Sequence, residues 1–222
     1  KEFLVQAREE LGERKLEQTT TFAIKSMDDP AYRTALSPTR VTRTFISLGG
    51  NRTPGMHEVD YGHYCFLELP SALQTGRTYT VQVAGRGAVR FTYDELHLVS
   101  RAIKVNQAGY LPNAPVKMAY LGAFAYELGP IPFDHAKSFS VVDVASGKEV
   151  FTGPVRLRER NPRFTPKNKE QEAATRPFMY GEDVYELDLT GLKAEGNFFI
   201  TVPGVGRSWP FRHAADTYGE AF

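Results

Sequence analysis

Adjacent acidic residues are the first places in this 222-residue sequence where chemistry could occur, because general acid–base catalysis often uses two neighbouring carboxyl groups. Candidate pairs are Glu9-Glu10, Asp28-Asp29 and Glu182-Asp183. Each pair lies in a polar stretch typical of a loop, and Pro30 directly after the second pair favours a turn there. Carboxylates in such settings are most simply solvated charges. We therefore predict no catalytic residue in these pairs.

A second candidate is a metal site at His57, Asp60 and His63. Side chains alternate between the two faces of a strand, so His57 and His63 would share a face while Asp60 points the other way. Cys65 is the one cysteine of the sequence, so the Cys-x-x-Cys spacing of zinc sites is absent. We expect no metal site here, and we expect Cys65 to pack as a small core residue.

Two Gly-x-Gly runs, Gly85-Arg-Gly87 and Gly204-Val-Gly206, raise the question of a dinucleotide or phosphate site. Both lie between alternating apolar residues, which indicates hairpin turns and not the strand-to-helix junction that such a site needs. No cofactor is therefore expected. The 27 basic residues are scattered and the net charge is +1, so nothing indicates a nucleic-acid or membrane partner. The apolar runs are too short to span a bilayer.

The elements that would position any site are strands, and the clearest signal is a hairpin near the end of the sequence. Alternate residues of Phe198–Val202 are apolar, as in a strand with one buried face. Residues 203–206 then contain a proline and two glycines, which favour a turn, and the alternation resumes at Trp209 and Phe211. This pattern predicts that both of these aromatic side chains are buried.

The same scheme occurs twice. Residues 73–91 repeat the order found at residues 192–211: a leucine, a glycine, an aromatic residue, alternating β-branched residues, Gly-x-Gly and a closing phenylalanine. Upstream, Ala23-Ile-Lys25 corresponds to Ala102-Ile-Lys104. Such a repeat implies two copies of one structural plan. In this plan Tyr79 occupies the position of a tyrosine corner, whose hydroxyl bonds to nearby backbone.

We therefore predict an all-β protein made of two tandem immunoglobulin-like β-sandwiches, at residues 19–100 and 101–213, since the length suits two domains of about 100 residues. Residues 1–18 form an N-terminal extension, either a short amphipathic helix or a loose leader. The expected core residues are Phe22, Ile24, Phe45, Tyr79, Val81 and Phe91 in the first sandwich, and Phe139, Val141, Phe198, Ile200, Val202, Trp209 and Phe211 in the second.

Two stretches are expected to be loops. Residues 49–55, after a strand predicted at 41–48, are rich in glycine and contain a proline, which indicates a flexible loop. Residues 156–182 are rich in charged residues and proline and have no clear period. A stretch of that length without regular structure is unusual in a compact domain and indicates a functional or a mobile loop.

The second domain resembles a known family. Ile103-Lys-Val-Asn-Gln-Ala-Gly-Tyr-Leu-Pro112, followed by Pro115-Val-Lys-Met-Ala-Tyr120, is similar to the opening of the immunoglobulin-like domain that precedes the catalytic domain of glycoside hydrolase family 9 cellulases. Residues 139–153 are similar to its middle strands, and Tyr185–Leu189 and Gly196–Phe211 to its closing strands. The resemblance covers about residues 101–213.

This resemblance implies an extracellular or periplasmic accessory region of a cellulase of the endoglucanase type, acting in plant-polysaccharide degradation. Its partner is the catalytic helical barrel of the same polypeptide, on which the domain packs, and residues 214–222 correspond to the start of that barrel. The catalytic carboxylates belong to the barrel, so no catalysis is expected from residues 1–222. The candidate residues for the interface with the barrel are Tyr110, Leu111, Pro112, Tyr218 and Phe222.

The alternative function is a carbohydrate-binding module that holds β-glucan on exposed aromatic side chains. Trp209 is the single tryptophan, and its alternation with Phe211 places it in the core. Tyrosines in loop-like stretches could be exposed, but they show no spacing that indicates a flat platform for sugars. The sequence therefore favours the structural role.

Overall fold

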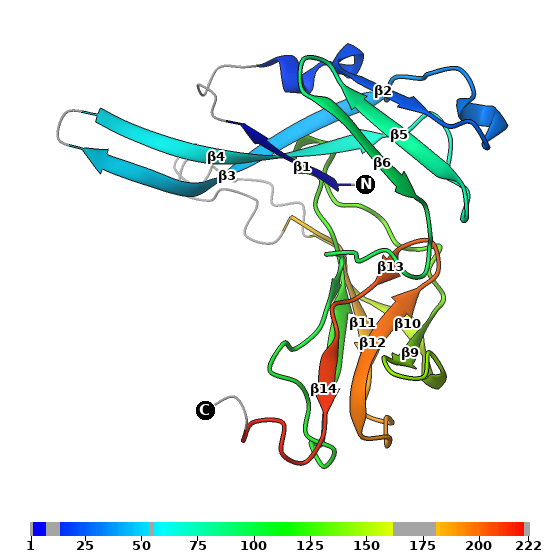
Figure 1. The fold of residues 1–222 in the computed structure, drawn as a ribbon. Helices are drawn as coiled ribbons and strands as arrows, with labels where there is room; N and C mark the ends of the chain where they lie inside the picture. Colours follow the sequence, from blue (N-terminus) through cyan, green and yellow to red (C-terminus); the bar gives the residue numbers. More distant parts are fainter. Residues whose placement is uncertain (1, 8–13, 54–55, 162–180, 220–222) are drawn as a thin grey trace, which may run out of the picture. The chain divides into compact units, whose positions relative to one another are not determined.

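The protein, described here from a computed structural model, is built from strands and short 3₁₀ turns (Figure 1). The structure describes residues 2–7, 14–53, 56–161 and 181–219, and it contains no α-helix within these ranges, which agrees with the all-β prediction. No helix in this described part is long and apolar enough to cross a membrane. The chain divides into two compact units, Lys1–Tyr93 with Ala125–Leu128, and Asp94–Phe124 with Gly129–Phe222.

The first unit contains two antiparallel sheets of three strands each, in the orders β1-β4-β3 and β2-β5-β6. Its 3₁₀ turns are η1 (Arg14–Glu17), η2 (Thr19–Thr21), η3 (Pro30–Tyr32) and η4 (Tyr126–Leu128). Its strands are β1 (Glu2–Ala7), β2 (Phe22–Lys25), β3 (Arg40–Thr53), β4 (Met56–Glu68), β5 (Thr78–Val83) and β6 (Gly87–Thr92).

The core of the first unit confirms most of the predicted residues. Phe22, Ile24, Tyr79 and Val81 are buried, and Phe91 packs half-buried against them. The prediction for Phe45 is wrong, because this side chain is 44% exposed. Phe45 pairs with His63 across β3 and β4, and neither side chain belongs to the core cluster of this unit.

Cys65 also lies in this core, as predicted, and is fully buried. Its sulfur lies 4.0 Å from the carbonyl oxygen of Leu16. Burial raises the pKa of the Cys65 thiol to about 11, because a thiolate would lose its hydration there. A thiol that stays protonated at neutral pH is a poor nucleophile, so Cys65 acts as a packing residue.

Tyr79 forms the predicted tyrosine corner. Its hydroxyl accepts a hydrogen bond of 2.9 Å from the backbone nitrogen of Gln74 and donates one of 2.5 Å to Oδ2 of Asp29. Asp29 is fully buried, and its Oδ1 accepts from the backbone nitrogen of Ala31 at the start of η3. The prediction that Asp29 is a solvated charge is therefore wrong, although the turn at this point is confirmed. Burial and this carboxylate raise the pKa of Tyr79 to about 12.

Replacing Tyr79 by phenylalanine is expected to destabilise the first unit by about 1–3 kcal/mol. The change removes the only side-chain donor to Oδ2 of Asp29 among the described contacts. A buried acceptor that is left without a partner destabilises the fold by the full free energy of its desolvation. Denaturant unfolding monitored by circular dichroism measures the effect. Tyr218→Phe is the control, since the Tyr218 hydroxyl makes contacts of only 3.4 and 3.5 Å. Equal, small effects of both changes would contradict the role given to the corner.

The N-terminal extension and the predicted loop at residues 49–55 both differ from expectation. The described residues of the N-terminal extension, 2–7 and 14–18, form neither the amphipathic helix nor the loose leader: β1 pairs with β4, from Glu2 opposite Phe66 to Ala7 opposite Tyr61, and the 3₁₀ turn η1 lies at Arg14–Glu17. Residues 49–53 extend β3 and pair with β4 after a register shift at Ser47. In both cases backbone bonds to a long partner strand outweigh the weak local preference of the segment.

The second unit is a sandwich in which one long strand joins two sheets. The first half of β10 (Glu149–Glu159) pairs with β9 (Ser138–Asp143), and its second half pairs with β11 (Val184–Asp188). The full strand order is β13-β12-β9-β10-β11-β8-β7, and β14 pairs with β12. The remaining strands are β7 (Ile103–Lys104), β8 (Met118–Leu121), β12 (Gly196–Val202), β13 (Gly206–Arg207) and β14 (Phe211–His213).

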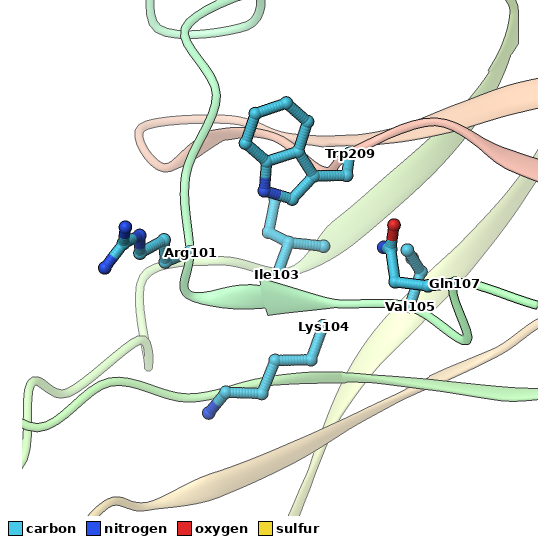
Figure 2. A pocket seen from close by; sticks show the side chains of 6 residues that line it. All are labelled: Arg101, Ile103, Lys104, Val105, Gln107 and Trp209. Atoms are coloured by element: carbon cyan, nitrogen blue, oxygen red, sulfur yellow. The ribbon is translucent and has the colours of Figure 1, made fainter. Parts of the chain in front are cut away.

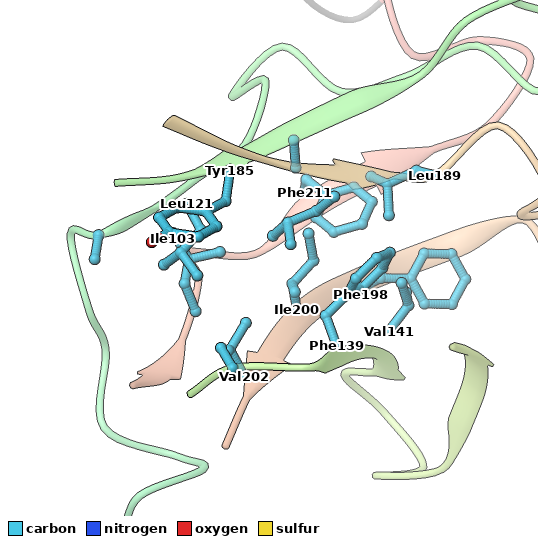
Figure 3. Packing of buried hydrophobic residues seen from close by; sticks show 14 of the residues in the cluster. Ile103, Leu121, Phe139, Val141, Tyr185, Leu189, Phe198, Ile200, Val202 and Phe211 are labelled. Atoms are coloured by element: carbon cyan, nitrogen blue, oxygen red, sulfur yellow. The ribbon is translucent and has the colours of Figure 1, made fainter. Parts of the chain in front are cut away.

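Apolar side chains from both sheets meet in the core of this unit (Figure 3). Phe211 packs edge-to-face on Tyr110, with ring centroids 5.3 Å apart, and Phe198 contacts its other side at 6.1 Å. Six of the seven predicted core residues are confirmed as buried: Phe139, Val141, Phe198, Ile200, Val202 and Phe211.

Trp209 is the exception, and its predicted burial is wrong: the side chain is 54% exposed. The prediction assumed one continuous strand from residue 206 to Phe211, but β13 ends at Arg207 and β14 begins at Phe211. Between them the hydroxyl of Ser208 accepts a hydrogen bond from the backbone nitrogen of Ile200. The Ser208 hydroxyl thus accepts the hydrogen bond that a backbone carbonyl oxygen would accept in a regular strand pair. The alternation of side chains between the two faces is therefore interrupted at residues 208–210.

The internal repeat is confirmed for its hairpins only. Val83 pairs with Gly87 across one turn and Val202 pairs with Gly206 across the other, so the two turns have the same length. Upstream, the two copies differ: β2 pairs with the hairpin strand β5, whereas β7 pairs with β8 and not with the hairpin strand β12. The matched sequences therefore encode similar hairpins in different sheet orders.

The predicted irregular stretch at residues 156–182 also begins later than expected. Residues 156–159 belong to β10, where Arg156 pairs with Glu186 and Leu157 with Tyr185. Residues 162–180 lie outside the described residues. The charged side chains of residues 156–159 lie on an exposed part of this strand, where Arg158 forms an ion pair of 2.8 Å with Glu186.

Candidate functional site

The second unit carries a concave surface beside Trp209 (Figure 2). The indole lies over Ile103, and Arg101 and Gln107 lie on opposite sides of this pair in the view, while Lys104 points the other way. The concavity has a volume of about 430 Å³ and is lined by Arg101, Ile103, Lys104, Val105, Gln107 and Trp209.

The backbone that carries Trp209 is held on both sides. The Ser208 hydroxyl accepts from the nitrogen of Ile200 at 2.9 Å and donates to the carbonyl oxygen of Trp209 at 2.7 Å. The backbone nitrogen of Ser208 donates to the carbonyl oxygen of Ile200 at 2.8 Å, and Pro210 fixes the backbone after the tryptophan. The serine and the proline beside Trp209 were therefore a signal in the sequence that this tryptophan leaves the strand pattern.

The other wall of the concavity comes from β7 and the residues after it. Ile103 is buried in the core, so it gives the concavity a rigid floor. Lys104 donates to the carbonyl oxygen of Gly122 at 3.1 Å and forms an ion pair with Glu182. The other polar side chains that line the concavity are Arg101 and Gln107.

The acidic pair Glu182-Asp183 has structural partners. Glu182 pairs with Lys104, and Asp183 is buried, so the prediction that this pair is solvated is wrong. Oδ2 of Asp183 accepts from Arg160 at 2.7 Å, and its Oδ1 accepts from the backbone nitrogen of Asn161.

A second carboxylate completes this ion-pair network. Arg160 also donates to Asp134 at 2.7 Å, and the hydroxyl of Tyr185 donates to the same carboxylate at 3.0 Å. The hydrogen bond from Arg160 is the main cause of the lowered pKa of Asp134, and the hydrogen bond from Tyr185 lowers this pKa further. The Asp134 carboxylate is thus held ionised, which suits ion pairing and not the protonated form that a general acid needs. Glu9 and Glu10 lie outside the described residues.

Of the three residues considered above for a metal site, where none was expected, only His63 has a described side chain. No group of three or more metal-ligand side chains is found among the residues that the structure describes. His57 pairs with Arg52 and Asp60 with Gly49 along the hairpin, and their side chains lie outside the described set. His63 is buried, with its Nδ1 3.0 Å from a nitrogen of Arg43.

His63 is expected to make the stability of the first unit depend on pH. Because a guanidinium can only donate, Nδ1 of His63 accepts, and its proton sits on Nε2, which has no hydrogen-bond partner in the described structure. Burial and the charge of Arg43 lower the pKa of His63 below its ordinary value of 6.5. Between the lowered and the ordinary value, the unfolded chain binds more protons, so the free energy of unfolding falls as the pH falls through this window.

Chemical unfolding at about pH 7.5 and about pH 5 tests this expectation. His63→Gln keeps an acceptor for Arg43 and should reduce the loss of stability at the lower pH. His97→Gln is the control, because His97 is exposed beside Asp94 in the second unit. An unchanged pH dependence in His63→Gln would show that another group titrates.

The five candidate interface residues have different environments. Tyr110 is buried rather than exposed: its hydroxyl donates to the carbonyl oxygen of Met118 at 2.8 Å, and its backbone nitrogen donates to Arg212. Leu111 and Pro112 are half-buried, and Tyr218 is 39% exposed. Phe222 lies outside the described residues. Tyr110 therefore belongs to the core, and Tyr218 is the exposed aromatic of the set.

Comparison with known structures finds proteins of low overall similarity, among them the following three. A metagenome-derived glycoside hydrolase family 9 endoglucanase is 26% identical, with a TM-score of 0.36, over 50% of this chain and 18% of that protein. A Bacteroides ovatus GH9 protein is 19% identical (TM-score 0.35) over 54% and 16%, respectively. A pullulanase from Anoxybacillus sp. LM18-11 is 9% identical (TM-score 0.20) over 90% and 22%. This chain thus spans less than a quarter of each.

The comparison with protein families is more specific. No curated protein matches the chain. Residues 99–207 match the family model described as the cellulase N-terminal ig-like domain. The match agrees with the observed two-sheet sandwich and with the resemblance drawn from residues 103–120 and 185–211. The segment at residues 99–207 is therefore a member of the family of cellulase N-terminal ig-like domains.

Proposed function

We propose that this chain is a non-catalytic accessory region of a cellulase of the glycoside hydrolase family 9 type, and that its second unit packs on and stabilises a catalytic helical barrel. The match of residues 99–207 to the cellulase N-terminal ig-like family carries the proposal. We further propose two sandwich domains, at residues 19–100 and 101–213, in an extracellular or periplasmic enzyme that degrades plant polysaccharides.

The carboxylates described above support a non-catalytic role. Inverting hydrolysis of a glycosidic bond needs one protonated and one ionised carboxyl group, about 6.5–9.5 Å apart, on either side of a cleft. Asp29 instead bonds to the buried Tyr79 hydroxyl, and both Asp183 and Asp134 bond to Arg160. These residues stabilise the two units and do not form an acid and base pair across a cleft.

The described end of the second unit is well suited to hold a following domain. The turn after β14 is tied back to the core: the backbone nitrogen of Ala214 donates to Tyr110, and Thr217 is buried and donates to Ala214 at 2.7 Å. Tyr218 is presented on this anchored turn, with its hydroxyl 3.4 Å from the carbonyl oxygen of Gly109. An aromatic side chain on a rigid support is a common anchor for a domain contact.

Intact-mass measurement of the protein purified from its source is the first test. The proposal predicts a polypeptide much larger than the 24.9 kDa of these residues. Residues 1–222 alone should release no reducing sugar from carboxymethylcellulose. Release that disappears when one acid of this chain is replaced would overturn the non-catalytic assignment.

A second test concerns stabilisation. The unfolding temperature of the second unit should be higher in the full polypeptide than in residues 1–222, and Tyr218→Ala should reduce the difference. Val144→Ala is a matched control, because Val144 is also exposed but lies in the turn after β9. If the full polypeptide and the shorter chain unfold at the same temperature, the proposed stabilising role is wrong.

A further inference from the structure

The exposed indole of Trp209 is the starting observation. A tryptophan that is 54% exposed leaves a large apolar area in contact with water, which is unfavourable in free energy. Here hydrogen bonds of Ser208 to Ile200 and to the carbonyl oxygen of Trp209 hold the backbone that keeps the indole in this exposed position. The side chain is therefore presented in a defined place before any ligand arrives. Such preorganisation lowers the cost of binding.

The chemistry of the concavity is mixed. The indole and the half-buried Val105 supply apolar surface, while Arg101 and Gln107 supply donors and an acceptor beside it. A ligand that fits this arrangement has an apolar face of the size of an aromatic ring and hydroxyl groups around its edge. A pyranose ring has this composition, because its C–H bonds gather on the ring faces and its hydroxyls point outward.

We propose that the Trp209 concavity binds one sugar unit of a glycan chain, with the pyranose face stacked on the indole and the ring hydroxyls bonded to Gln107 and Arg101. A protein surface that buries the indole is the competing occupant, and the experiment with the full polypeptide below distinguishes the two. The choice of a β-1,4-glucan as the glycan rests on the proposed function; the stacking site itself does not.

The sequence makes this site easy to observe, since Trp209 is the single tryptophan. Fluorescence excited selectively at the indole therefore reports on this site alone. In residues 1–222 without ligand, the emission should have the long wavelength of a water-exposed indole, and acrylamide should quench it. Titration with cellohexaose should shift the emission to shorter wavelength in a saturable way and protect it from quenching.

Calorimetric titration of variants tests the assignment of residues. Trp209→Ala should weaken binding of cellohexaose about tenfold or more, as expected for an aromatic anchor. Gln107→Ala should weaken it by a smaller factor, and Trp209→Phe should retain part of the affinity. Val144→Ala, which changes an exposed apolar side chain of the same unit in the turn after β9, should leave it unchanged. Binding that is absent, or equal in Trp209→Ala, would overturn the proposal.

Two further measurements distinguish the proposed sugar site from the proposed accessory role. Saturable binding of maltohexaose in place of cellohexaose, lost in Trp209→Ala, would keep the sugar site and exclude a β-1,4-glucan as its ligand. Short-wavelength emission in the full polypeptide, with no response to either sugar, would show that another part of the protein covers Trp209. That last outcome overturns the sugar site while supporting the packing on a barrel.

Discussion

Phe211→Ala is expected to lower the free energy of unfolding of the second unit by about 3–5 kcal/mol, because it empties the centre of a packed core. The phenylalanine is buried and packs against two aromatic rings, Tyr110 from the loop after β7 and Phe198 from β12. Rings held in different elements cannot close the space without moving their strands, so most of the cavity should persist. Denaturant unfolding, followed by the fluorescence of Trp209, measures the change.

Trp209→Ala is the matched control, two residues away on the same segment. Its side chain is exposed, so its loss should change the stability by about 0.5 kcal/mol or less. Circular dichroism must then follow unfolding, because this variant has no tryptophan. A large loss in Trp209→Ala, together with a small one in Phe211→Ala, would place the tryptophan in the core and contradict both the fold and the proposed sugar site.

The contrast between these two residues shows what the sequence could predict. Regular alternation identified the core side of β12, where Phe198, Ile200 and Val202 are all buried. It failed two residues beyond β13, because the Ser208 side chain bonds to Ile200 and interrupts the strand. A period of two holds only while the backbone stays extended and paired. Side-chain-to-backbone bonds of serine are local exceptions that composition does not reveal.

The burial of charged side chains is a second feature that the sequence did not predict. The sequence placed Asp29 correctly in a turn before Pro30, yet Asp29 is buried because the Tyr79 hydroxyl, fifty positions away, reaches its carboxylate. Long-range partners of this kind cannot be predicted from local polarity. The same holds for β1, whose strand conformation depends on its pairing with β4 and not on its own residues.

The candidate site was found only in part. The resemblance at residues 103–112 indicated the family, and these residues do form β7 and one wall of the concavity. The opposite wall, Trp209, comes from more than a hundred residues further along the chain. Sheet pairing brings the two together: Ser100 donates to the carbonyl oxygen of Arg207 at 2.8 Å, two positions before the tryptophan. No local pattern could have predicted that contact.

The same contact makes Gly206 the most sensitive glycine of the hairpin. Its φ is +119°, and a Cβ at this position would lie 2.2 Å from the carbonyl oxygen of Leu98. That oxygen accepts the backbone hydrogen bond of Arg207 at 2.9 Å, so it cannot move without breaking the pairing of residues 98–100 with β13. Gly206→Ala should therefore destabilise the second unit by about 3 kcal/mol or more, from backbone strain and from lost hydrogen bonds.

Gly147→Ala separates the two causes. Gly147 also has a positive φ, +67°, but a Cβ there would meet no atom within 4 Å. It should cost only the strain of a left-handed alanine, about 1–2 kcal/mol. Unfolding in denaturant gives both values, and the difference between them measures the clash with Leu98. If the two variants lose the same stability, the carbonyl oxygen of Leu98 moves aside without a cost in free energy. The segment from Leu98 to Ser100 would then not hold in place the backbone that carries Trp209.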